Sequence, residues 1–152
     1  MACPYFMPVS KLEGGNWLHP ARLPLGGGWN GHCTAPGHEQ AVPSQDVLEA
    51  CCNLGYAGSC SWAPAERPSD GVRFAVSSPA RNGRGSSMNS SENEPPRLLR
   101  LTYVYERANH PAGNGELEYD LSTASWLRRH ENACIQKMAE CFLESYLRKR
   151  RS

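Results

Sequence analysis

The sequence predicts an α+β fold in which a small antiparallel sheet of about three strands is covered by a C-terminal helix. Within residues 71–152, short segments alternate apolar and polar side chains, and the last stretch has an apolar period near 3.6 residues. Residues 1–42 show neither period and are rich in proline and glycine. We therefore expect one domain over 1–152, with an irregular cysteine-rich lobe in 1–70 and the sheet and helix in 71–152.

The first 42 residues are not expected to form regular elements. They include five prolines and the glycine run "LPLGGGWNGHC". Proline removes a backbone donor and glycine loosens the backbone, so neither a long helix nor a central strand is expected. Disordered tracts are usually poor in aromatic residues, whereas this segment contains Tyr5, Phe6, Trp17 and Trp29. We therefore expect the segment to wrap around an anchor.

A short helix is predicted from Ser44 to about Gly55. Ser44 is a suitable N-cap, and Gly55 is placed to end the helix. One apolar stripe, spaced i, i+4 and i+7, is formed by Val47, Cys51 and Leu54. This stripe makes Cys51 a small buried side chain and leaves Cys52, at its edge, free to reach a ligand.

Three segments alternate as half-buried strands, namely 72–76, 97–107 and 115–122. Asn114-Gly115 suits the turn between the second and third of these strands. The polar tract 77–96 has nothing to bury, and we expect it to be a flexible loop inside the domain.

Residues 131–150 are predicted to form a helix that lies on the sheet. Its apolar stripe consists of Ile135, Met138, Ala139, Phe142, Leu143 and Tyr146. Cys134 and Cys141, spaced i, i+7, flank this stripe. We expect them to pack against the sheet and regard them only as reserve metal ligands.

The candidate metal ligands are four cysteines of the irregular lobe: Cys3, Cys33, Cys52 and Cys60. Three of them lie within two residues of a proline or glycine, in loops that can bring backbones close together. Four thiolates would saturate either a Zn²⁺ ion or the irons of a [4Fe–4S] cluster. Because metal-binding free energy is also folding free energy, such a centre would order the lobe.

The spacing of these cysteines favours an iron–sulfur cluster over zinc. Structural zinc sites usually contain a C-x₂₋₄-C knuckle, whereas this chain has C-x₂₉-C-x₁₈-C-x₇-C. Ligands that arrive separately suit a bulkier centre, and Cys3-Pro4 is reminiscent of the Cys-Pro pair among ferredoxin ligands. The alternative is zinc, bound by the four thiolates or by three of them with His32 or His38.

The composition of the chain argues against several classes of protein and indicates a cellular location. The net charge of +1 creates no global field that would recruit nucleic acid or an anionic membrane. No apolar run approaches the ~20 residues of a membrane span, and the first residues lack the basic and apolar parts of a secretory signal. We expect a cytoplasmic protein, because thiols stay reduced there and seven cysteines suit a disulfide framework poorly.

These observations favour a small cytoplasmic metal-binding protein whose [4Fe–4S] cluster has a structural, electron-transfer or redox-sensing role. The alternative is a zinc-stabilised module that contacts nucleic acid or a protein through its basic C-terminus: Arg148, Lys149, Arg150 and Arg151. A third hypothesis is a thiol-dependent enzyme. Its nucleophile would need a base in contact with it, and the sequence adjacency of His32 and Cys33 does not supply that contact, so an enzyme is less favoured.

Overall fold

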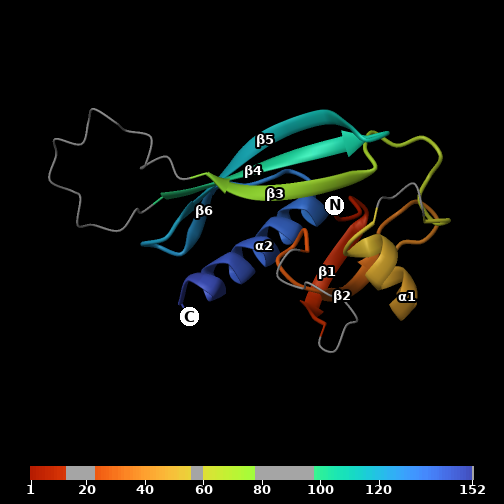
Figure 1. The fold of residues 1–152 in the computed structure, drawn as a ribbon, viewed down its shortest axis with the longest axis horizontal. Coiled ribbons are helices and arrows are strands. Elements are labelled where there is room, and N and C mark those ends of the chain that lie inside the picture. The colour runs from red at the N-terminus through yellow and green to blue at the C-terminus, as the bar shows by residue number, and fades with distance from the viewer. Residues whose placement is uncertain (13–22, 56–59, 78–97, 152) are drawn as a thin grey trace, which may run out of the picture.

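The computed structural model describes residues 1–12, 23–55, 60–77 and 98–151, and it shows a mixed α+β fold with two antiparallel sheets and a C-terminal helix (Figure 1). In chain order the elements are β1 (Phe6–Lys11), β2 (Trp29–Cys33), α1 (Gln45–Val47), the π-helical turn η2 (Leu48–Cys52), β3 (Gly71–Ser77), β4 (Leu98–Arg107), β5 (His110–Asp120), β6 (Ser125–Arg128) and α2 (Ala133–Arg151). The expected loop over 77–96 lies outside the described residues, apart from Ser77 in β3.

The larger sheet is a four-stranded meander in the order β3-β4-β5-β6. The alternation of 72–76 and 97–107 predicted β3 and β4 to within a residue at each end. Their buried side chains, together with Leu117 of β5, form the face that packs on α2: Val72, Phe74, Leu99, Leu101 and Leu117. The expectation of one sheet of about three strands is wrong: this sheet has a fourth strand, β6, and β1 and β2 form a second sheet. β6 is only four residues long and mostly exposed, so its pattern is too short to be recognised.

The turn between β4 and β5 is not at Asn114-Gly115, as the sequence suggested. The chain reverses at Ala108 and Asn109, whose φ angles are 51° and 66°, and β5 starts directly after them at His110. Gly115 instead lies within β5 opposite Tyr103, and a side chain at Gly115 would overlap the Tyr103 ring. The Asn-Gly pair therefore makes room for an aromatic ring on the neighbouring strand.

The C-terminal helix α2 lies against the larger sheet and also contacts β1 of the N-terminal lobe (Figure 1). Asn132 caps it, because its Oδ1 accepts the backbone N–H groups of Cys134 at 2.8 Å and Ile135 at 3.2 Å. The predicted stripe is buried or partly buried throughout, and the Phe142 ring stacks on Phe74 of β3. Within the described ranges, no helix combines the length and apolarity that crossing a bilayer requires.

The first 42 residues contain two strands, β1 and β2, where no regular element was expected. β1 and β2 pair antiparallel, with a register shift between Pro8 and Ser10 that accommodates the proline in the strand. Gly31 of β2 is required by the close pairing, because a methyl group there would overlap the Met7 carbonyl oxygen. This small sheet and the larger one share a single buried core, which is described next where it reaches the cysteines.

Candidate functional site

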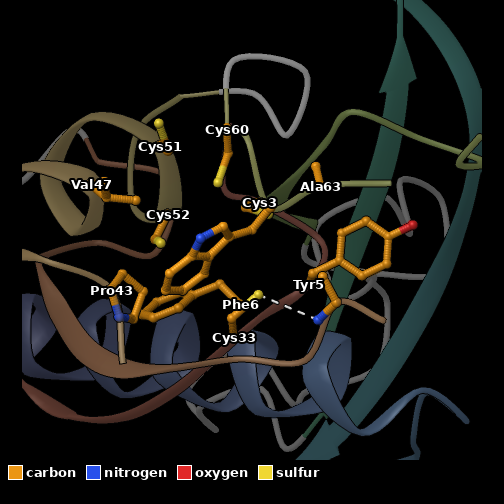
Figure 2. A pocket seen from close by; sticks show the side chains of 12 residues that line it. Cys3, Tyr5, Phe6, Cys33, Pro43, Val47, Cys51, Cys52, Cys60 and Ala63 are labelled. Atoms are coloured by element: carbon orange, nitrogen blue, oxygen red, sulfur yellow. Dashed lines mark hydrogen bonds between the residues drawn. The ribbon is translucent and has the colours of Figure 1, made fainter. Parts of the chain in front are cut away.

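Five cysteine side chains line one cavity in the N-terminal lobe (Figure 2): Cys3, Cys33, Cys51, Cys52 and Cys60. The cavity is narrow: its volume is about 10 Å³, which is room for about one water molecule. Its other walls are aromatic and aliphatic, and no charged side chain lines it among the described residues. The four cysteines selected from the sequence thus lie together, and a fifth joins them.

Cys3 reaches the cavity because the chain before it is fixed to two other elements. Ala2 forms a reciprocal pair of backbone hydrogen bonds with Val72 of β3, both 2.9 Å long. The backbone N–H of Cys3 donates to the Cys52 carbonyl oxygen at 3.1 Å. These bonds place the Cys3 thiol between the larger sheet and η2.

Cys33 is the last residue of β2, and its sulfur accepts a backbone hydrogen bond. The N–H of Ala35 donates to Cys33 Sγ at 3.3 Å. Cys3 has the same arrangement, since the backbone N–H of Tyr5, also two residues downstream, lowers its pKa by hydrogen bonding. Backbone donors aimed at sulfur stabilise the thiolate form, which is the form that binds metals.

The π-helical turn brings both Cys51 and Cys52 to the cavity. Ser44 caps α1 as expected, with its Oγ accepting the Val47 N–H at 3.4 Å. The chain then widens, and the Asn53 N–H donates to the Leu48 carbonyl oxygen at 3.0 Å, which is an i→i+5 bond.

This wider turn overturns the predicted stripe of Val47, Cys51 and Leu54, which assumed 3.6 residues per turn. Cys52 is buried, with 6% of its surface exposed, whereas Cys51 is only half-buried and Leu54 is 47% exposed. The assignment of Cys51 as the buried side chain of the pair was therefore wrong, and Gly55 lies beyond the helical end at Cys52.

Asn53 fixes η2 to β2, and the sequence analysis did not identify it. It is fully buried, and its Oδ1 accepts the Trp29 N–H at 2.9 Å. Its Nδ2 donates to the carbonyl oxygens of Trp29 at 3.0 Å and Leu48 at 2.9 Å. The side chain thus replaces a neighbouring strand for Trp29 and sets the position of η2 relative to Cys33. The only sequence signal is a polar residue at the end of a predicted helix, where exposure is the ordinary expectation.

Trp62 covers the cavity, and His38 supports it. The two rings stack with centroids 4.8 Å apart and an interplanar angle of 9°. Neither His38 nor His32 lines the cavity, so the zinc alternative with three cysteines and a histidine has no imidazole beside the thiols. Among the described residues, no three cysteine, histidine or acidic side chains are arranged to hold a metal ion.

The buried thiols of the cavity are held in their protonated form. Burial is the main cause that raises the pKa of Cys3 to about 12, and the neighbouring thiols, Cys33 first, contribute to this rise. Burial also raises the pKa of Cys52 and, less strongly, that of Cys33. A cation that binds these sulfurs must therefore displace protons, and its affinity must rise with pH.

The two cysteines of α2 lie outside the cavity. Cys134 and Cys141 are buried within the core, and Cys134 Sγ lies 3.3 Å from Thr34 Oγ1. All seven cysteines belong to the described residues, and none forms a disulfide.

Cations near the C-terminus have partners on their own helix. Arg148 pairs with Glu144 at 2.9 Å. Arg150 donates to Tyr146 Oη at 3.0 Å, and its guanidinium lies 5.6 Å from the centre of that ring. These contacts satisfy two of the four basic residues considered as a partner surface.

The chain matches no protein-family model, no curated protein and no solved structure.

Proposed function

We propose that the chain is a small metal-binding protein of the cytoplasm whose cavity holds a [4Fe–4S] cluster through Cys3, Cys33, Cys52 and Cys60. The observation that carries this proposal is the convergence of thiols from four separate segments on a cavity without charged side chains. A buried free cysteine packs as a small apolar side chain, and such packing does not require other cysteines beside it. Five around one space indicate a shared ligand.

The residues present fit such a cluster in their chemistry. Thiolates are the usual ligands of [4Fe–4S] clusters, and hydrogen bonds to the sulfurs and low solvent exposure tune these centres. The cavity supplies backbone donors to Cys3 and Cys33 and an aromatic cover in Trp62. All seven thiols are free, which agrees with a reducing compartment.

A cluster is favoured over a single zinc ion because the two centres require different separations between the four sulfur atoms. Zinc holds four thiolates at about 2.3 Å, which draws the sulfurs into mutual contact. A cluster has four separate iron corners, so it accepts ligands that approach from different directions.

A cluster bound by four protein thiolates would leave no iron open to a substrate, so we propose a structural, electron-transfer or redox-sensing role rather than catalysis. The structural contribution follows from connectivity, because the ligands belong to the N-terminal segment, β2, η2 and the chain before β3. One centre would link all four segments. Sensitivity to oxidants is favoured by the partial exposure of Cys51 and Cys60 at the cavity.

Elemental analysis of protein purified without oxygen tests the proposal directly. We expect about four irons and four sulfides per chain, with a brown colour and broad visible absorption. Protein with one equivalent of zinc and no sulfide would establish the zinc-stabilised module instead. Metal-free, folded protein would contradict both.

Single cysteine substitutions, compared with one another, identify the ligands. Cys52→Ala should lose most of its iron and sulfide, whereas Cys141→Ala, which removes a buried thiol outside the cavity, should retain both. Cys51→Ala should also retain the cluster, because it leaves the four proposed ligands in place. Equal iron content in all three variants, with unfolding curves confirming that each is folded, would refute the assignment.

A further inference from the structure

A second cavity lies beside the cysteine cavity, between the N-terminal lobe, the larger sheet and the start of α2. Its volume is about 470 Å³. This is the size of clefts that hold small organic molecules. Its walls contain prolines and two tyrosines, Tyr5 and Tyr105, and none of its lining side chains is charged. We refer to it as the tyrosine groove.

A chain of hydrogen bonds ends at the hydroxyl of Tyr105, one of the residues that line this groove. The backbone N–H of Asn132 donates to His130 Nδ1 at 2.9 Å, so Nδ1 carries no proton. The neutral imidazole therefore carries its proton on Nε2, which lies 2.6 Å from Tyr105 Oη and donates to it. Burial lowers the pKa of His130, which keeps the ring in this neutral form.

The proton of Tyr105 is consequently left to donate elsewhere. Burial raises the pKa of Tyr105 to about 12, so the hydroxyl keeps its proton at neutral pH. Among the described residues, no second hydrogen bond to this hydroxyl is present. Of the other hydroxyl-bearing residues that line the groove, Thr34 donates to the Tyr5 carbonyl oxygen at 2.7 Å and is engaged inside the protein.

We propose that the tyrosine groove binds a small, uncharged organic molecule with a flat ring and a carbonyl oxygen that accepts a hydrogen bond from Tyr105. None of the lining side chains is charged. A charged ligand would therefore find no ion-pair partner in the groove, and a buried charge needs one. Flat tyrosine and proline surfaces suit a ring. The oriented Tyr105 hydroxyl selects an acceptor.

Binding of benzamide to the reduced full-length protein, followed by amide NMR shifts, tests the proposal. We expect saturable shifts at Ala112 and Ile135, which line the groove. Toluene lacks the acceptor and benzoate adds a charge, so each should bind at least about fivefold more weakly, the factor that corresponds to one net hydrogen bond.

Variants separate the hydroxyl from the groove itself. Tyr105→Phe should weaken benzamide about fivefold and leave toluene unchanged, while Tyr119→Phe, on β5 with its ring against Trp126, should change neither. Ala112→Leu places bulk at an exposed position of the groove and should abolish binding of both probes.

The proposal is refuted if benzamide shifts do not saturate, if Tyr105→Phe binds benzamide as well as the parent, or if Ala112→Leu has no effect. Should Tyr105→Phe fail to fold, the Ala112→Leu result decides. The readout is independent of iron and sulfide content, so its failure leaves the proposed cluster untouched.

Discussion

Replacing Asn53 should damage the N-terminal lobe more than its small size suggests. In Asn53→Ala, the N–H and C=O of Trp29 lose the partners that they have in the structure, whereas the Leu48 carbonyl still accepts the residue 53 N–H. A buried backbone group without a partner costs about 1–3 kcal/mol. The free energy of unfolding should therefore fall by about 2–6 kcal/mol, a large part of the roughly 5–15 kcal/mol of a typical domain.

Urea unfolding of the reduced protein, followed by tryptophan fluorescence, measures this loss. Asn114→Ala, at an exposed position of β5, is the matched control and should stay within about 0.5 kcal/mol of the parent. Asn53→Leu restores side-chain volume without hydrogen bonds, and it should be as unstable as Asn53→Ala. A stable Asn53→Leu variant would show that packing, and not the hydrogen bonds to Trp29, holds η2 against β2.

Three further predictions follow from the same structure. The pKa of Cys3 is raised to about 12 in the folded protein. Its contribution to the stability of the metal-free protein should therefore be complete below about pH 9 and be lost as the pH rises towards 12. Urea midpoints that stay constant from pH 8 to 11 would contradict this. Ala108→Gly should raise the free energy of unfolding by about 0.5–1 kcal/mol in urea unfolding, since φ is 51° there, and a loss of stability would count against the turn geometry. Gly31→Ala should lower the free energy of unfolding by about 1–3 kcal/mol, because the added methyl group overlaps Met7. Gly27→Ala, where there is room for a methyl group, should lower it far less. Equal losses in the two variants would argue against the close pairing of β1 and β2.

The sequence predicted those parts of the fold in which apolar residues recur at the period of a strand or a helix. Alternation over 72–76 and 97–107 predicted two long strands because each strand buries one face against α2. The stripe within 131–150 predicted α2 for the same reason, although the helix begins later, at Ala133. In each case the burial pattern repeats at the period of the element, so no distant partner is needed to recognise it.

The structure of the N-terminal lobe was harder to predict from the sequence, because it depends on contacts between residues that are far apart in the chain. β1 and β2 contain Pro8 and Gly31 and are defined by contacts such as Phe6 with Cys33. Asn53 likewise acquires its role from Trp29, which is 24 residues away. Neither relation leaves a periodic trace in the sequence.

The candidate site was found through the chemistry of its side chains rather than through its geometry. Thiols are uncommon enough that Cys3, Cys33, Cys52 and Cys60 could be selected from composition and spacing, and they do line one cavity. Cys51 was missed because a π-helical turn, which no local propensity announces, moves both adjacent cysteines to the cavity. That a metal is bound here, and which metal, both stay predictions.

Tyr5 forms part of the wall of both the cysteine cavity and the tyrosine groove. Because one residue contributes to both walls, a movement of Tyr5 that a guest on one side requires would change the space on the other. Such a coupling would be equal in both directions, because linked equilibria are reciprocal. An occupant of the groove would then respond to the state of the sulfur atoms behind the shared wall.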